Sequence, residues 1–151
     1  MKTLSEFDDI RPFAPEELPE VYDRLLANEQ FHKVLDFLYP GVPIEVIGQN
    51  MHKCKTGLDF QKAFAYPFLK GLIAKASTGC DMDTSEIDSS KQHTFISNHR
   101  DIVLDSAFLS VMQIDKGFPT TCEIAIGDNL LSIPWVRDLA RVNKSFIVKR
   151  G

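Results

Sequence analysis

A histidine with two carboxylates close behind it is the arrangement in this sequence best suited to chemistry. His99 precedes Asp101 and Asp105 in the run Ser97-Asn98-His99-Arg100-Asp101-Ile102-Val103-Leu104-Asp105. An imidazole titrates near neutral pH, so it can accept a proton there. A carboxylate bonded to its other nitrogen selects the tautomer and stabilises the imidazolium that forms. Asp105 is the first candidate for that carboxylate, and Asp101 is the second.

The same residues also have a purely structural interpretation. Asp101 could be a helix N-cap, and Asp105 could support the first turn of the helix that follows. On spacing alone, the structural interpretation is the more common one. The triplet His99-Arg100-Asp101 also occurs in protein kinases, but Ser106 stands where a kinase has asparagine, and no glycine-rich phosphate loop is present. A kinase is therefore excluded.

Charge and cysteine content exclude several classes of protein. Lys and Arg number 17 against 21 Asp and Glu, a formal charge of −4. A nucleic-acid binder needs a basic surface, so we expect no nucleic-acid partner. The three cysteines form no CxxC pair, which favours a reducing compartment and no zinc site. The N-terminus has no apolar signal core, and no run of 18 apolar residues could span a bilayer.

The first half of the chain reads as helical. Apolar residues recur at helical spacing over 15–27 and again over 31–38, after which Pro40-Gly41 ends the pattern. Pro43 is expected at the first position of another short helix. These segments predict a helical N-terminal bundle.

A strongly apolar stretch follows at Phe60–Ala76. Thr56 and Asp59 have the spacing of a capping box ahead of it, and Pro67 is expected to kink it. Two interpretations are open. The favoured one is a buried helix of the N-terminal bundle, because its polar face is narrow. The other is an interfacial helix at a lipid surface.

The second half alternates strands and helices. We expect strands over 94–97, 123–126 and 145–148, and helices over 102–114 and 134–142. Strands that alternate with helices indicate a parallel sheet. His99 would then follow the first strand at its carboxyl end, where ligands bind in open α/β sheets.

The predicted fold is therefore α/β: a helical N-terminal bundle followed by the first part of a mostly parallel sheet with flanking helices. The predicted organisation is a helical region over 1–80, a polar linker over 81–92 and the first half of an α/β domain over 93–151. A parallel sheet needs both faces covered, and three strands with two helices cover few. We therefore expect the chain to be an N-terminal fragment of a longer protein.

Two blocks of sequence resemble the glycerolipid acyltransferase superfamily, which acylates glycerol-3-phosphate and 1-acylglycerol-3-phosphate (lysophosphatidate). The first is Asn98-His99-Arg100 with its downstream aspartate. The second runs from Asn129-Leu130-Leu131-Ser132-Ile133-Pro134-Trp135 to Phe146-Ile147-Val148-Lys149-Arg150. Together they cover roughly residues 92–151. Five residues rather than the family's four separate His99 from Asp105, and Lys149 stands where arginine is common.

The resemblance implies an enzyme of phospholipid synthesis, a phospholipid/glycerol O-acyltransferase. Such enzymes move a fatty acyl group from an acyl-CoA or acyl-carrier-protein thioester to a hydroxyl of glycerol-3-phosphate, lysophosphatidate or a similar acceptor. His99 would be the general base and Asp105 its partner, with Asp101 as the alternative carboxylate. The implied substrate-binding residues are Arg100, Arg141, Lys149 and Arg150. No metal and no cofactor beyond the thioester co-substrate is implied.

The expected location is the cytoplasm or, as a peripheral protein, the inner face of the cytoplasmic membrane, with contact to the membrane surface. The alternative function is a noncatalytic interaction module or an inactive fragment of such a protein. In that case the five-residue spacing marks a decayed site.

Overall fold

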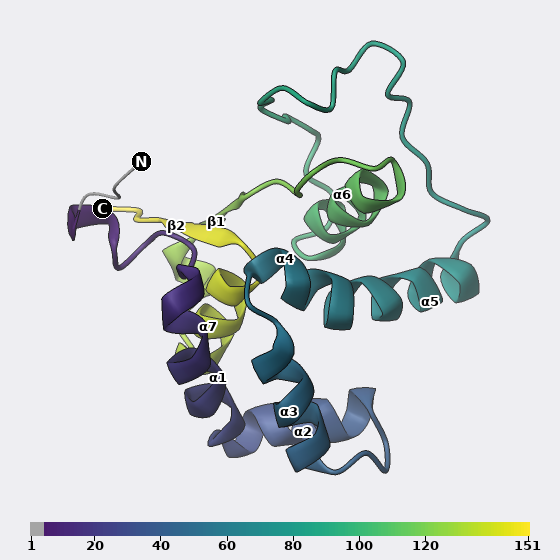
Figure 1. Ribbon diagram of the computed structural model, residues 1–151. Coiled ribbons are helices and arrows are strands. Elements are labelled where there is room, and N and C mark those ends of the chain that lie inside the picture. Colours follow the sequence, from purple (N-terminus) through teal and green to yellow (C-terminus); the bar gives the residue numbers. More distant parts are fainter. Residues whose placement is uncertain (1–4) are drawn as a thin grey trace. The chain divides into compact units, whose positions relative to one another are not determined.

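The computed structural model describes residues 5–151, which form two compact units (Figure 1). The first unit contains the chain up to Phe60 together with Glu123–Gly151, and the second contains Gln61–Cys122. The first four residues of the predicted helical region 1–80 lie outside the described residues. The predicted boundaries between 1–80, 81–92 and 93–151 stay a prediction. The first compact unit joins segments from opposite ends of the chain, and the second is one continuous segment.

The first unit is mainly helical. Its α-helices are α1 (Leu18–Leu26), α2 (Glu29–Leu38), α3 (Ile44–Lys53), α4 (Gly57–Phe60) and α7 (Pro134–Val142), with 3-10 turns at Ser5–Phe7, Pro15–Glu17 and Asp128–Leu130. Helix α1 packs against α2, α3 and α7. The helices predicted over 15–27, 31–38 and 134–142 are confirmed.

Local sequence explains where these helices begin and which faces they bury. Helix α1 buries an apolar stripe at helical spacing, Leu18, Val21, Tyr22 and Leu25. Asn28 caps α2, because its side-chain oxygen accepts hydrogen bonds of 3.0 Å from the amides of Gln30 and Phe31. Pro43 is the N-cap of α3 and not its first helical residue, one position earlier than predicted.

A parallel pair of strands completes the first unit. Strand β1 (Ile124–Gly127) pairs with β2 (Ser145–Val148), with Ile124 opposite Ser145. Helix α7 connects them in the chain, so this segment is a β-α-β unit, and the strands predicted over 123–126 and 145–148 are confirmed. The amide of Ile147 also donates a hydrogen bond of 2.8 Å to the carbonyl of Ile10.

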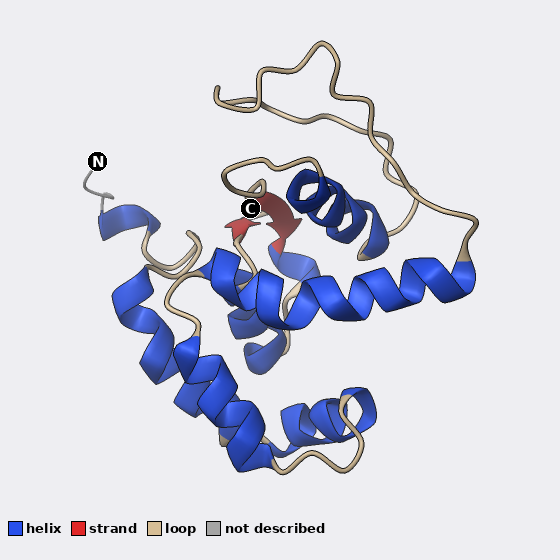
Figure 2. Ribbon diagram, turned by 45° about the vertical axis from the view of Figure 1, so that its right-hand side comes forward, coloured by secondary structure: helices blue, strands red, loops and turns tan. Residues whose placement is uncertain are grey.

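The second unit consists of a π-helical stretch (Gln61–Ala65), α5 (Tyr66–Ala76) and α6 (Leu104–Asp115), with a long loop over 77–103 (Figure 2). Helix α5 packs against α6. Two hydrogen bonds join the helices, because Asp115 accepts from the Tyr66 hydroxyl at 2.5 Å and from Lys70 at 2.8 Å.

The capping box predicted at Thr56 and Asp59 is confirmed. The Asp59 amide donates to the Thr56 hydroxyl at 3.1 Å, and the Thr56 amide donates to the Asp59 carboxylate at 2.9 Å. Pro67 lies in the first turn of α5, directly after the π-helical stretch, and the kink expected at Pro67 stays a prediction. The prediction that Phe60–Ala76 is a buried helix of the N-terminal bundle is wrong, since Leu69 is the only buried residue of α5 and α5 lies in the second unit.

The strand predicted over 94–97 is also wrong. These residues belong to the long loop, and β1 pairs with β2 in a sheet of those two strands. A strand needs a neighbouring ladder for its backbone hydrogen bonds, and residues 94–97 have none. The Phe95 ring instead meets the rings of His93 and Phe118, and Ile96 is 93% exposed.

The fold class is confirmed: a helical N-terminal part is followed by a partial parallel sheet with flanking helices. The sheet has two strands where the sequence predicts three. Among residues 5–151, every helix is too short or too polar to cross a membrane.

Candidate active site

His99 and Asp105 lie together in the second unit. The Nδ1 atom of His99 is 3.3 Å from Oδ2 of Asp105, and the imidazole side chain is 67% exposed. An ionised carboxylate can only accept hydrogen bonds, so a neutral imidazole in this pair carries its proton on Nδ1. The lone pair of Nε2 is then available to accept a proton.

Asp105 holds the segment before α6 in a folded-back conformation. Its Oδ2 atom accepts hydrogen bonds from the backbone amides of Arg100, at 2.6 Å, and of Asp101, at 2.9 Å. These contacts bring His99 next to Asp105 although five residues separate them. The amides of Asp101 and Arg100 lower the pKa of Asp105, and His99 lowers it further.

Asp101 has a different set of contacts. Its Oδ1 atom accepts hydrogen bonds from the amides of Val103, at 2.9 Å, and Leu104, at 2.7 Å, where α6 begins. These two bonds lower the pKa of Asp101. Asp101 therefore binds the backbone amides at the start of α6, whose N-cap is Val103. Asp105 is the carboxylate that contacts His99. Their roles in catalysis stay predictions.

Arg100 follows His99 directly and is exposed. The other three basic residues predicted to bind substrate, Arg141, Lys149 and Arg150, belong to the first unit.

Arg141 makes internal contacts within the first unit. Its guanidinium donates to the backbone carbonyls of Arg11, at 2.7 Å, and Asp8, at 2.6 Å. It also lies 3.9 Å from the centre of the Phe13 ring. The side chain is buried, and burial lowers its pKa. Substrate binding by Arg141 stays a prediction, and these internal contacts count against it.

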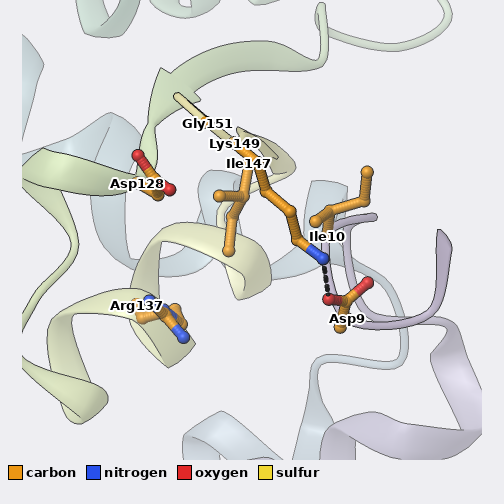
Figure 3. A pocket seen from close by; sticks show the side chains of 7 residues that line it. All are labelled: Asp9, Ile10, Asp128, Arg137, Ile147, Lys149 and Gly151. Atoms are coloured by element: carbon orange, nitrogen blue, oxygen red, sulfur yellow. Dashed lines mark hydrogen bonds and ion pairs between the residues drawn. The ribbon is translucent and has the colours of Figure 1, made fainter.

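Lys149 lines a pocket of about 340 Å³ beside the sheet (Figure 3). Its amino group pairs with Asp9, and that pairing lowers the pKa of the Asp9 carboxyl. The residues that line the pocket carry both signs of charge and come from both ends of the chain: Asp9, Ile10, Asp128, Arg137, Ile147, Lys149 and Gly151. The pocket is therefore not a purely basic cradle.

Arg150 lies beside the turn after β1. Its backbone amide is 3.4 Å from Oδ2 of Asp128. Its Nε atom would be 3.0 Å from a Cβ atom at Gly127, so the side chain passes close to the glycine backbone. A larger residue at Gly127 would force Arg150 to move.

Sequence reasoning missed three polar residues of this pocket, Asp9, Asp128 and Arg137. Arg137 is one of five basic residues in the segment 137–150 and has no local feature that sets it apart. Asp9 is 140 positions before Lys149. No local spacing could have joined Asp9 to this pocket. Within residues 5–151, no group of three or more His, Cys, Asp or Glu side chains is arranged to hold a metal ion.

The model of the acyltransferase family matches residues 82–151. Residues 82–151, 70 of the 151 residues, are similar to this family. It is the glycerolipid acyltransferase family that the two sequence blocks resemble. The matched range contains the His99–Asp105 pair and the whole β-α-β unit. No match was found among the curated proteins or the solved structures.

Proposed function

We propose that the protein transfers a fatty acyl group from an acyl-CoA or acyl-carrier-protein thioester to a hydroxyl of glycerol-3-phosphate, lysophosphatidate or a similar acceptor. The family match supports acyl transfer in general. The observation that carries the proposed site is the 3.3 Å contact between His99 Nδ1 and Asp105, which leaves Nε2 available as a base.

In the proposed reaction, Nε2 of His99 removes the proton of the acceptor hydroxyl as the oxygen attacks the thioester carbonyl carbon. A tetrahedral intermediate forms, with its negative charge on the former carbonyl oxygen. When the carbon–sulfur bond breaks, the thiolate takes the proton from His99 and leaves as the thiol. Asp105 holds the ring and stabilises the imidazolium in between.

Basic residues are proposed to bind the phosphate of the acceptor. Arg100 adjoins His99 in the chain, and a guanidinium can bind phosphate in a bidentate manner. Lys149 and Arg150 are the remaining candidates, from the first unit. Because the acyl donor and product are lipidic, we place the reaction in phospholipid synthesis, with the protein peripheral at the cytoplasmic face of the membrane.

A pair of variants tests the base. Acyl transfer is followed as release of free thiol from an acyl thioester in the presence of glycerol-3-phosphate or lysophosphatidate. We expect His99→Ala to lower the rate about 10²–10⁴-fold, the usual contribution of a general base. His52→Ala is the matched control, because His52 also pairs with an aspartate, at 3.0 Å, and it should leave the rate within about twofold.

The same assay separates the enzyme from a noncatalytic module. Undiminished transfer by His99→Ala would remove the proposed base. Absence of thiol release with every donor and acceptor pair would favour the noncatalytic interaction module instead.

A further inference from the structure

Asp9 is held between two residues whose backbone carbonyls are anchored. The Asp8 carbonyl accepts a hydrogen bond of 2.6 Å from the guanidinium of Arg141. The Ile10 carbonyl accepts one of 2.8 Å from the amide of Ile147 in β2. All five residues belong to the first unit. Because the backbone is fixed on both sides of Asp9, the position of this residue beside the pocket is built into the fold.

The Asp9 carboxylate is bound to the amino group of Lys149, and both side chains line the pocket that also contains Arg137 (Figure 3). The side chain of Lys149 is 62% exposed and that of Asp9 is 60% exposed. An ion pair this exposed contributes little to the stability of a fold. Lys149 is also one of the residues proposed to bind the acceptor phosphate. An anionic ligand that approaches Lys149 therefore meets a carboxylate that is already bound to it.

We propose that Asp9 is an internal competitor of the acceptor phosphate for Lys149 and thereby sets how much negative charge an acceptor must carry. The inference rests on the proposed function, because it takes the ligand to be a phosphorylated acceptor. A phosphomonoester carries about 1.5 to 2 negative charges at pH 7, so it attracts the lysine more strongly than the single charge of Asp9 does. A phosphodiester carries one charge and gains nothing from the exchange.

Binding of glycerol-3-phosphate to the 151-residue chain is measured by NMR titration at neutral pH. We expect Asp9→Asn to bind it about three- to fivefold more tightly than the wild type, the range of an exposed ion pair, because no carboxylate has to leave Lys149. Asp9→Glu keeps the carboxylate and should bind as the wild type does. The methyl ester of glycerol-3-phosphate, a phosphodiester, should bind the wild type more weakly than glycerol-3-phosphate itself.

A double variant tests whether the effect of Asp9 passes through Lys149. In the Lys149→Gln background, Asp9→Asn should change the affinity for glycerol-3-phosphate less than about twofold, because the partner of the carboxylate is absent. The matched control is Asp36→Asn on α2, which removes the same charge from an exposed position of the first unit. It should also change the affinity less than about twofold.

Asp9→Asn also has a kinetic signature that a merely structural role would not produce. In the thiol-release assay, it should lower KM for the acceptor about three- to fivefold and leave kcat within about twofold, since only binding of the acceptor changes. Tighter binding of glycerol-3-phosphate by Asp9→Asn, without thiol release by any variant, would refute the proposed reaction and leave the role of Asp9 intact. Failure of either proposal is therefore visible separately.

Several results would overturn the proposal. Equal affinity of Asp9→Asn and the wild type for glycerol-3-phosphate would do so, as would no binding by either. An equal gain in Asp36→Asn or in the Lys149→Gln background would show that the effect does not act on Lys149. Equal affinity of the wild type for glycerol-3-phosphate and its methyl ester would remove the charge requirement. Weaker binding by Asp9→Asn would make Asp9 a residue that positions Lys149, the opposite of a competitor.

Discussion

Residues 5–151 contain two histidine–aspartate pairs, one in each compact unit. His99 Nδ1 lies 3.3 Å from Asp105, and His52 Nε2 lies 3.0 Å from Asp23. The His52 ring packs edge-on against Tyr22, with 5.6 Å between ring centres. The distances alone would favour the His52 pair as the catalytic one. The chemistry favours the His99 pair, for two reasons.

The first reason is how the carboxylate is held. Asp105 accepts two backbone amides in addition to the imidazole, so its position is fixed by the chain around it. Asp23 is exposed on α1, and its pairing with α3 joins two helices. The second reason is the nitrogen used. His99 bonds through Nδ1 and keeps Nε2 available, whereas His52 uses Nε2. A short distance alone therefore does not identify a catalytic pair. The fixed position of Asp105 and the available Nε2 of His99 are what distinguish the His99 pair.

The two units also differ in how many apolar residues they bury. The first unit buries a continuous apolar set that includes Leu25, Phe31, Met51 and Val142. In the second unit the buried apolar residues are Leu69 and Val111, alongside four buried polar ones, Gln61, Ser110, Gln113 and Thr121. Regions with few buried apolar contacts open locally at low cost in free energy. The proposed site thus lies in the less strongly packed unit.

Of the changes proposed below, Asp105→Asn should have the largest effect. It tests directly whether the His99–Asp105 pair is the one that acts in catalysis. The amide leaves the shape nearly intact but can no longer stabilise an imidazolium or fix the Nδ1–H tautomer. We expect acyl transfer to fall on the order of 10³-fold, mainly in kcat. Thiol release over a range of acceptor concentrations measures it.

Asp101→Asn and Asp23→Asn are the controls for that experiment. Asparagine is as good an N-cap as aspartate, so Asp101→Asn should retain the rate within about threefold. Asp23→Asn should do the same. A loss in Asp101→Asn equal to that in Asp105→Asn would transfer the partner role to Asp101.

Core truncations sharpen the contrast between the units. Leu25→Ala should lower the free energy of unfolding of the first unit by about 2–5 kcal/mol, the usual cost of removing a buried leucine. Leu69→Ala should cost less, since fewer apolar neighbours surround it. Urea unfolding combined with hydrogen exchange resolved by segment measures both. Equal costs would contradict the difference in packing.

Removing the N-cap of α2 should have a smaller effect on the stability of the first unit. Asn28→Ala leaves the amides of Gln30 and Phe31 without their side-chain acceptor, so we expect a loss of about 1 kcal/mol in unfolding free energy. Asn28→Ser keeps a capping oxygen and should lower the free energy of unfolding by only a few tenths of a kcal/mol. A shift in urea midpoint at constant slope is the measurement.

The smallest effect is local and depends on pH. The two amide donors lower the pKa of Asp105 below its ordinary value of 3.8. A depressed pKa means that the stabilisation is complete above the ordinary value and is lost as pH falls through the lower, folded value. The amide resonances of Arg100 and Asp101 should therefore shift below about pH 4 and not in Asp105→Asn. Unchanged resonances in the wild type down to unfolding would contradict this.

Much of the fold could be predicted because it depends on neighbours in the sequence. The stripe of α1, the cap at Asn28 and the capping box at Thr56 and Asp59 all act within one helical turn. The alternation of strand, helix and strand over 123–148 likewise determined the β-α-β unit. The contact of His99 with Asp105 also lies within reach of local spacing, since the two are six positions apart.

The remainder depends on partners that are distant in sequence. The run at 94–97 has strand-forming residues, yet a strand exists only where a neighbouring ladder accepts its hydrogen bonds. The family resemblance implies that Arg141 binds substrate, yet its side chain is buried and its guanidinium donates to the carbonyls of Asp8 and Arg11. The interpretation of Phe60–Ala76 as a buried helix failed because hydrophobicity says that a surface must be covered but not by what.

The sequence by itself determined the helices, the β-α-β unit and the pairing of a histidine with an aspartate, because backbone hydrogen bonds and caps close over a few residues. Only the tertiary structure decided which cations stay exposed and which apolar face stays uncovered. Those outcomes depend on long-range packing and on the desolvation of particular groups, which local spacing does not encode.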